Sequence, residues 1–260
     1  MNILHAILLG IIEGVTEFLP ISSTFHLLMA TKLLGLTQTE FSKFFDVFIQ
    51  AGAILAVVVI FAKEWFSNWD LLKKVAVAFV PTAVVGFLLH NLIKSVLFES
   101  FQSMAVVFIV VGFFFLLVEQ KLGKQADSIK KTVADMTWLQ AGLIGLAQAM
   151  AVMPGVSRAG AVIIAMLLMG YNREDAAKFS FTLAVPTILA AAALDLVKSR
   201  ELLGQTGGSE LTLLVVGSAA AFISAFVVVK WFIAFLRTQT FRIFGWYRIV
   251  AGAALFWLVR

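Results

Sequence analysis

Long uninterrupted apolar segments constrain this chain more than any other feature. Each has about the ~20 residues that an α-helix needs to cross ~30 Å of hydrocarbon, whereas strands of a membrane barrel would alternate apolar and polar residues over short runs. With 61% hydrophobic and 13% charged residues, the 260-residue chain is also too apolar for a soluble domain. The sequence therefore predicts an all-α polytopic membrane protein, with spans near residues 45–62, 73–93, 100–119, 178–197, 211–236 and 243–259.

The charge and the cysteine count narrow the function classes. The net charge is +5, but the basic residues are scattered through short loops. We therefore expect no nucleic-acid partner and assign these charges to orientation and to anionic lipid headgroups. The chain has no cysteine, which excludes disulfides, zinc–thiolate sites and thiol catalysis. The N-terminus lacks a basic region, so we expect no cleavable signal peptide.

The apolar stretch 10–30 contains polar residues that need an explanation, because a charge at membrane depth costs at least a few kcal/mol. Glu13 and Glu17 are one helical turn apart and share a face. Pro20 then breaks the helix, and hydroxyl side chains begin the next one. The sequence predicts a bent helical hairpin with these polar side chains on its two arms: Glu13, Glu17, Ser22, Ser23, Thr24 and His26.

A second stretch, beginning at Gly142, repeats the first when the sequence is shifted by 135 positions. Matched glycines, a matched serine beside a proline bend and a matched Lys-Phe pair predict an internal repeat. We expect one membrane domain, with repeat one at about 1–119 and repeat two at about 136–260. The matches include Gly10 with Gly145, Glu13 with Gln148, Ser22 with Ser157, Ser23 with Arg158 and Gly35 with Gly170.

If each hairpin is re-entrant, it returns to the side that it left, and three full spans remain in each half. Because three is odd, the second half starts from the opposite face and the repeat is inverted. The predicted architecture is six transmembrane helices plus two re-entrant helical hairpins, a plan in which sites form near the midplane. Most basic residues then lie opposite the N-terminus, so the positive-inside bias places both termini outside.

The carboxylates and the second hairpin suggest two kinds of ligand. Glu13 and Glu17 can hold a hard divalent cation through oxygen, although such a pair can also snorkel at a helix end. In the second hairpin, Gly155 allows an unusual backbone angle, Ser157 can cap the next helix, and Arg158 can bind phosphate oxygens bidentately. The structural alternative is an ion pair of Arg158 with Glu13 or Glu17.

The tip of the first hairpin carries Ser22, Ser23 and Thr24. If the two tips meet, two helix N-termini and an arginine converge on one anion, an arrangement that suits phosphoryl transfer. His26 can then act as a general base or acid. The structural alternatives are that these hydroxyls only cap a helix and that the histidine only packs. Gln50 is a weaker candidate for a supporting hydrogen bond.

At this point the sequence resembles a known family. Glu13-Gly-Val-Thr-Glu17-Phe-Leu-Pro-Ile-Ser-Ser-Thr-Phe-His26 and Pro154-Gly-Val-Ser-Arg158 are similar to the bacterial undecaprenyl-pyrophosphate phosphatases of the bacitracin-resistance type. The resemblance extends to residues 49–59, 135–138 and 179–186, and so covers nearly the whole chain. It implies hydrolysis of a C55 polyprenyl pyrophosphate to the monophosphate carrier of cell-wall synthesis, with Mg²⁺ or Ca²⁺, in the bacterial plasma membrane and at a site open to the outer face.

The resemblance also assigns roles to individual residues. Glu13 and Glu17 match the family's acidic pair, Ser23 and His26 match its proposed nucleophile or base, and Ser157 and Arg158 match its phosphate grip. Three departures reduce the hydrogen bonding expected around the phosphate: Phe25, Ala159 and Val162 stand where the family usually has a glycine and two hydroxyl residues.

Two other functions stay open at this stage. An inverted repeat with broken helices is also the plan of transporters, so a polyprenyl-phosphate or anion flippase is the first alternative. A non-catalytic membrane partner protein is the second, and it leaves the buried charges unexplained. The sequence is also compatible with a homodimer.

Overall fold

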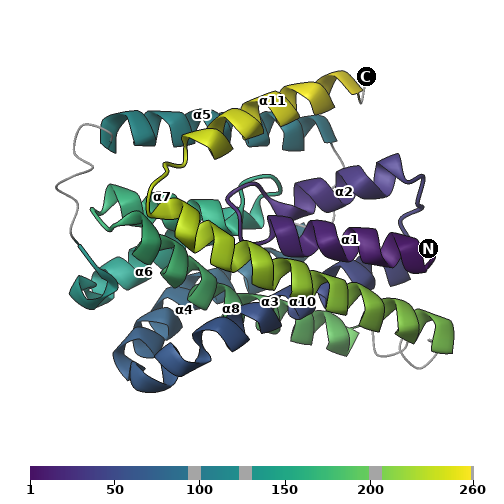
Figure 1. Cartoon of the computed structure of the whole chain (residues 1–260), viewed down its shortest axis with the longest axis horizontal. Helices are drawn as coiled ribbons and strands as arrows, with labels where there is room; N and C mark the ends of the chain where they lie inside the picture. Colours follow the sequence, from purple (N-terminus) through teal and green to yellow (C-terminus); the bar gives the residue numbers. More distant parts are fainter. Residues whose placement is uncertain (93–100, 123–130, 199–206, 259–260) are drawn as a thin grey trace.

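The computed structural model describes residues 1–92, 101–122, 131–198 and 207–258 (Figure 1). The described part of the chain is helical and contains no strand, as predicted. The first half contributes α1 (Ile3–Thr16), α2 (Ser23–Leu33), α3 (Glu40–Ser67), α4 (Trp69–Leu92) and α5 (Phe101–Leu122). The second half contributes η3 (Val133–Asp135), α6 (Trp138–Ala149), η4 (Met150–Val152), α7 (Arg158–Leu168), α8 (Arg173–Lys198), α10 (Gly208–Leu236) and α11 (Arg242–Leu258).

Five of the described helices are long and apolar enough to cross a membrane: α3, α4, α5, α8 and α10. They coincide with five of the six predicted spans. The sixth prediction, 243–259, falls on α11, which has 17 described residues and is shorter than the ~20 that a perpendicular span needs. The structure thus confirms a multi-pass, all-helical protein, while the count of six spans stays a prediction.

Both predicted hairpins are broken helices. Pro20 lies between α1 and α2, and Pro154 lies between η4 and α7. The second arms, α2 and α7, both have 11 residues and start 135 positions apart. Each is preceded by a serine with positive φ, 63° at Ser22 and 72° at Ser157. In Figure 1, α1 and α2 lie toward the end that holds the N-terminus, whereas α6 and α7 lie toward the opposite end.

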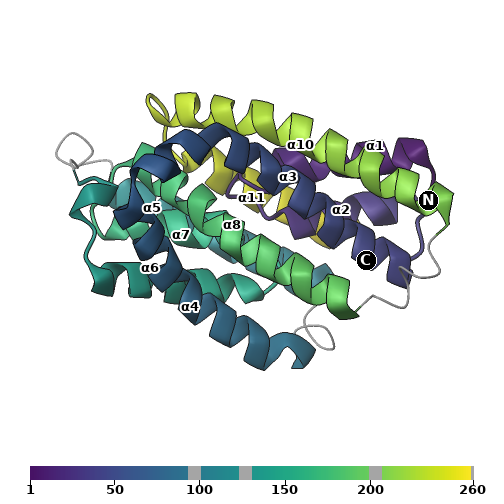
Figure 2. The ribbon, with the colours of Figure 1, turned by 90° about the horizontal axis from the view of Figure 1, so that it is seen from below.

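Small residues let the helices approach closely around the hairpins. Helix α10 packs against α1 and α3, α4 packs against α6 and α8, and α5 pairs with α11 (Figure 2). A Cβ added at Gly10 would lie 2.3 Å from the carbonyl oxygen of Gly217, and one added at Gly145 would lie 2.1 Å from that of Ala78. Close backbone contact of this kind is how membrane helices gain packing energy without a hydrophobic effect between them.

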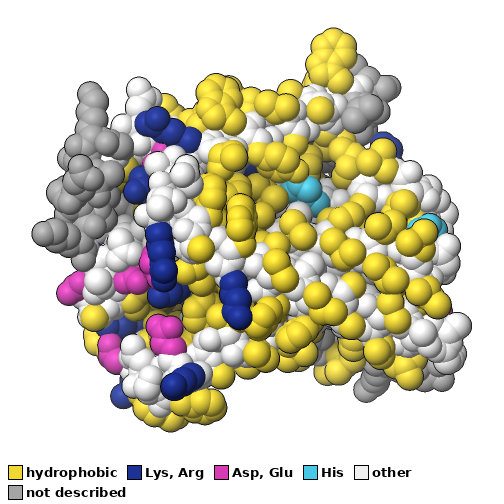
Figure 3. Space-filling view, in the orientation of Figure 1, with side chains coloured by type: hydrophobic (Ala, Val, Ile, Leu, Met, Phe, Trp, Pro, Cys, Tyr) yellow, Lys and Arg dark blue, Asp and Glu magenta, His cyan; other side chains and the backbone are white. Residues whose placement is uncertain are grey.

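Charged side chains concentrate at one end of the molecule. Figure 3 shows Lys, Arg, Asp and Glu gathered mainly on the side opposite the N-terminus, while hydrophobic side chains cover most of the remaining face. At that end Glu119 is buried, pairs with Arg173 at 2.7 Å and accepts a hydrogen bond from the backbone N–H of Phe241. This cluster ties α5 to the start of α8 and to the segment that leads into α11.

Candidate functional site

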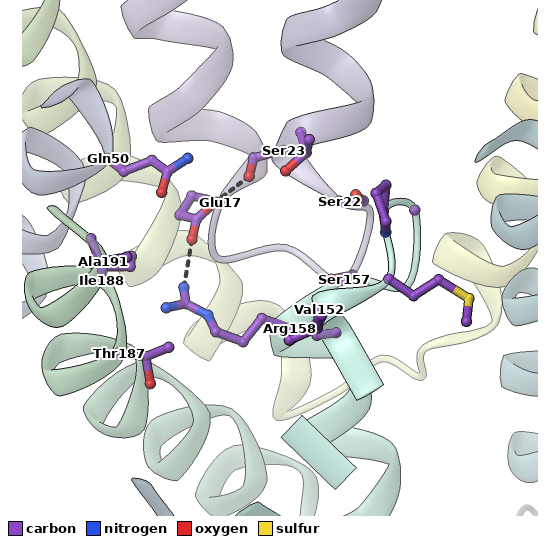
Figure 4. A pocket seen from close by; sticks show the side chains of 15 residues that line it. Glu17, Ser22, Ser23, Gln50, Val152, Ser157, Arg158, Thr187, Ile188 and Ala191 are labelled. Carbon is purple, nitrogen blue, oxygen red and sulfur yellow. Dashed lines mark hydrogen bonds and ion pairs between the residues drawn. The ribbon is translucent and has the colours of Figure 1, made fainter. Parts of the chain in front are cut away.

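A pocket of about 180 Å³ lies where the two hairpin tips meet (Figure 4). Helices α3 and α8 close its sides. It brings together seven of the predicted site residues from segments more than 100 positions apart in the sequence. Those residues are Glu17, Ser22, Ser23, Thr24, Gly155, Ser157 and Arg158, and they share the pocket with Gln50, Thr187, Ala151, Val152, Met153, Pro154, Ile188 and Ala191.

An ion pair across the two hairpins lies in this pocket. A guanidinium nitrogen of Arg158 lies 2.5 Å from a carboxylate oxygen of Glu17, and the two side chains are only 14% and 9% exposed. Arg158 also donates to the carbonyl oxygen of Ala184 on α8, at 3.2 Å. The predicted ion pair of Arg158 is therefore present, with Glu17 as its partner; the phosphate role of Arg158 is compatible with this pair and stays a prediction. Because each charge compensates the other, both can be buried in a membrane protein.

Two serines of the first tip, Ser22 and Ser23, differ in the contacts of their side chains. Ser23 donates its hydroxyl hydrogen bond to the other carboxylate oxygen of Glu17. Ser22, which precedes α2, makes no capping hydrogen bond with its side chain. Its left-handed backbone conformation is costly for a residue other than glycine, and such strain clusters at functional sites. The first amides of α2 therefore remain available to an anion.

The second tip differs from the first in that its serine caps the following helix. Ser157 caps α7 by accepting a hydrogen bond from the N–H of Gly160 at 3.2 Å, as predicted. Gly155 has φ of +92°, which favours glycine, and an added Cβ would lie 3.0 Å from the carbonyl oxygen of Met104. Both residues line the pocket. The second tip thus supplies a rigid backbone and Arg158, whereas the first supplies hydroxyls and free amides.

Arg248 on α11 is a residue that the sequence reasoning missed. Its side chain is fully buried and donates to the carbonyl oxygens of Pro20, Gly155 and Phe108. Its guanidinium also lies 4.2 Å from the centre of the Phe108 ring. Since Pro20 and Gly155 belong to the two different tips, this one side chain joins them. In the sequence it follows Trp246 and Tyr247, which looks like an ordinary membrane-interface cluster.

Glu13 does not line the pocket. It is fully buried, and neither carboxylate oxygen has a hydrogen-bond partner. The charged groups that act on it are Glu17, Asp46 and Arg158. An unpaired buried carboxylate is costly, so a cation would satisfy it. The described residues contain no group of three or more His, Cys, Asp or Glu side chains able to hold a metal, but magnesium is often held by one or two carboxylates plus phosphate oxygens.

His26 lies outside the pocket lining. Its Nδ1 is 2.8 Å from the carbonyl oxygen of Ser22, and its Nε2 is 2.6 Å from the hydroxyl of Tyr247. A carbonyl oxygen only accepts, so Nδ1 carries a proton, and in the neutral ring Nε2 accepts from Tyr247. The structure therefore does not bring His26 to Ser23, whose hydroxyl bonds to Glu17 instead.

The three residues that depart from the family pattern lie outside the pocket lining. Ala159 and Val162 are buried, on α7, and Phe25 stacks on Phe108 with ring centres 4.0 Å apart. The expectation that they reduce hydrogen bonding around a bound phosphate stays a prediction.

Two amides support the walls of the pocket. Gln50 of α3 lines it, as the weaker candidate of the sequence analysis. Gln148, buried on α6, donates to Thr82 at 2.9 Å and to the pocket residue Thr187 at 3.1 Å. Gln148 was noticed in the sequence only as the repeat counterpart of Glu13, and its role in holding Thr187 could not be read from spacing.

The fold and this site define a class: multi-pass helical membrane proteins in which two broken hairpins enclose a polar pocket with a buried Glu–Arg pair. Comparison with known proteins is more specific. The chain belongs to the family described as Bacitracin resistance protein BacA, which matches residues 6–254.

Similar proteins cover nearly the same length. One from Aquifex aeolicus, named undecaprenyl-diphosphatase, is 42% identical over 95% of both chains. A protein of the same name from Campylobacter fetus is 44% identical over 97% of both chains. Another, from Bdellovibrio bacteriovorus, is 41% identical over 98% of this chain and 95% of the relative.

Proposed function

We propose that this protein is an integral-membrane hydrolase that cleaves the terminal phosphate from undecaprenyl pyrophosphate, releasing inorganic phosphate and the monophosphate carrier of cell-wall synthesis. Family membership and the common name of its relatives support the reaction. The observation that carries it in this chain is the Arg158–Glu17 pair facing hydroxyls and an uncapped helix N-terminus in one pocket.

Substrate binding gives Arg158 a new anionic partner, the pyrophosphate, in place of Glu17. The pyrophosphate enters the pocket and takes the Arg158 fork from Glu17, while the first amides of α2 bind the oxygens of the terminal phosphate. The α2 amides are held by the fold before substrate arrives, and only Arg158 has to change partner, so little further reorganisation is needed as charge spreads over the phosphate oxygens in the transition state. Arg248 keeps the two tips at the separation that this grip requires.

The attacking group follows from the hydrogen bond of Ser23. Its hydroxyl already donates to Glu17, so Glu17, once free of Arg158, can take the proton while Ser23 Oγ attacks the terminal phosphorus. The bond to the polyprenyl monophosphate breaks, and water then hydrolyses the phosphoserine. In the alternative, His26 activates a water directly, which requires it to leave Tyr247 and Ser22. Ser23→Ala separates the two routes, because the first loses its nucleophile and the second does not.

A divalent cation, Mg²⁺ or Ca²⁺, belongs to the same proposal. Glu13 and Glu17 would hold it, and the orphaned carboxylate oxygens of Glu13 are the observation in its favour. When bound, the ion would neutralise the charge of the pyrophosphate. We expect EDTA to abolish phosphate release and added Mg²⁺ or Ca²⁺ to restore it.

The membrane setting completes the proposal. The matching lengths of α2 and α7, and the positive φ at both Ser22 and Ser157, support an inverted repeat with six spans and two re-entrant hairpins. The gathering of charge opposite the N-terminus favours that end as cytoplasmic, in the bacterial plasma membrane and with the pocket open to the outer face. A homodimer stays a prediction that a single chain does not test.

The direct test is phosphate release from undecaprenyl pyrophosphate by the protein purified in detergent. Wild type should release phosphate, and Glu17→Gln and Arg158→Ala should each lower kcat/KM by about a thousandfold, as expected for lost transition-state charge stabilisation. No release by wild type, or release by both variants equal to that of wild type, would contradict the proposal. Lipid movement across liposomes without phosphate release would instead identify the flippase.

A further inference from the structure

The walls of the pocket differ sharply in polarity. The interior is polar: Ser22, Ser23 and Ser157 are 6–7% exposed, and Arg158 and Glu17 are nearly as buried. Five apolar residues also line the pocket, beside Pro154, and we call them the apolar rim: Ala151, Val152, Met153, Ile188 and Ala191. They come from only two segments, η4 with the residue after it, and the second half of α8.

The apolar rim is where the pocket reaches the surface. Met153 is 46% exposed and Ala191 is exposed. Figure 4 shows Ile188 and Ala191 together on one side of the ion pair and Val152 on the other. The polar interior thus connects to the outside of the molecule past hydrophobic side chains from both segments.

The surface next to the apolar rim is also apolar. Met150 is 68% exposed and Leu189 is 46% exposed, and both are sequence neighbours of rim residues. Helix α8 is one of the five helices able to cross a membrane, so its exposed hydrophobic side chains face acyl chains. Exposed hydrophobic side chains therefore adjoin both segments of the apolar rim.

The geometry points to a path for the hydrocarbon tail of the substrate: we propose that the first isoprene units leave the pocket across the apolar rim, between Met153 and Ala191, directly into the bilayer. This rests on the proposed function. A tail bonded to a bound pyrophosphate must leave the pocket, and each buried CH₂ group favours an apolar route by about 0.8 kcal/mol. Alanine side chains leave room for branched methyl groups, and unbranched methionine adapts to them.

In this proposal the apolar rim determines which tails the enzyme accepts. The rim takes no part in the reaction at the pyrophosphate. Ala191→Trp should lower kcat/KM for undecaprenyl pyrophosphate by about tenfold or more, because the added ring occupies the path. The same variant should lower kcat/KM for isopentenyl pyrophosphate by much less than for undecaprenyl pyrophosphate, because a single isoprene unit reaches only the start of the path and loses fewer contacts. Val227→Trp, on the exposed face of α10, is the matched control and should resemble wild type with both substrates.

A labelling experiment tests the same path without relying on turnover or on a bulky substitution. Because the chain has no cysteine, Ala191→Cys and Val227→Cys each introduce a unique thiol. In detergent, farnesyl methylenediphosphonate should slow maleimide labelling of Ala191→Cys by about fivefold or more, since a bound tail covers the thiol. Methylenediphosphonate without a tail should not slow it, and neither compound should affect Val227→Cys.

Equal protection by the tailed and tail-less compounds, or protection of Val227→Cys as well, would overturn the proposed path. So would an equal loss of activity on both pyrophosphates in Ala191→Trp. These outcomes are distinct from failure of the proposed function, in which the wild-type protein releases no phosphate from undecaprenyl pyrophosphate.

Discussion

Glu17 makes two contacts at once, a hydrogen bond from Ser23 and an ion pair with Arg158. The pair has a role in stability and a proposed role in substrate binding. A double variant can separate the two roles. The pair keeps two charges compensated inside the protein at rest, and in the proposed function it releases Arg158 when a phosphate arrives. A single substitution disturbs both functions, because it leaves the other charge buried without a partner.

The double variant Glu17→Gln/Arg158→Met separates stability from chemistry. Arg158→Met alone should lower the free energy of unfolding by about 3 kcal/mol, because it strands a buried carboxylate. The double variant should recover most of that loss while phosphate release stays near background. Thermal melting in detergent, followed by tryptophan fluorescence, gives the first quantity. Recovery of activity together with stability would show that the pair is only structural.

Arg248 should contribute more to the free energy of unfolding than Arg242, the other arginine of α11. Arg248→Met removes donors from the carbonyl oxygens of Pro20 and Gly155 and leaves both buried, so we expect a loss of about 3 kcal/mol and slower phosphate release. Arg242→Met on the same helix is the matched control, because Arg242 is exposed and should change stability by less than about 0.5 kcal/mol. Equal melting temperatures for the two variants would contradict the assigned role.

Tyr247 offers a test of whether His26 has a catalytic role. If His26 activates water, it must first break its bond to the Tyr247 hydroxyl, which is worth about 1 kcal/mol net. Tyr247→Phe should then raise kcat by up to about fivefold, and His26→Ala should abolish turnover. If Ser23 attacks with Glu17 as base, Tyr247→Phe should leave kcat unchanged. A large loss of kcat in Tyr247→Phe would contradict both routes.

At the scale of elements, close helix contacts set the position of the hairpins. Helix α6 contains two glycines, and only one of them makes such a close contact. The two can therefore be compared within the same helix. A Cβ at Gly145 would lie 2.1 Å from the carbonyl oxygen of Ala78, whereas a Cβ at Gly142 would meet nothing within 4 Å. Helix α6 is therefore in close contact with α4 at Gly145 and not at Gly142.

Gly145→Ala should destabilise the protein by about 1–3 kcal/mol, because backbone must move to admit the methyl group. Gly142→Ala should be neutral, or stabilising by up to about 1 kcal/mol through helix propensity. Melting temperatures of the two purified variants provide the comparison. A Gly145→Ala protein as stable as wild type would show that α6 and α4 are farther apart than the structure has them.

Sequence spacing predicts the hairpins well and their surroundings poorly. The bends at Pro20 and Pro154 follow from local chemistry, and the pairing of Arg158 with Glu17 follows from the cost of leaving either charge alone. By contrast, Arg248 is joined to Pro20 and Gly155 by contacts over 228 and 93 positions, and nothing in its local sequence indicates them. The position of His26 was also unpredictable, because a rotation of one helix decides whether the ring faces the pocket or Tyr247.

At the scale of the whole molecule, we expect orientation in the membrane to follow from the placement of Lys and Arg. Single cysteines report it cleanly, because the natural chain has none. A membrane-impermeant maleimide should label Gln38→Cys, between α2 and α3, in intact cells. It should label Lys73→Cys, at the opposite end, only after permeabilisation. The reverse pattern would place the N-terminal end in the cytoplasm and would contradict an outward-facing pocket.

The measurement that tests the account most directly is a structure of the wild-type protein with a polyprenyl methylenediphosphonate bound. We predict the phosphonate between the two tips, within hydrogen-bond distance of Arg158 and of the first amides of α2, with the Arg158–Glu17 pair opened. A phosphonate bound elsewhere, with that pair still closed, would contradict it.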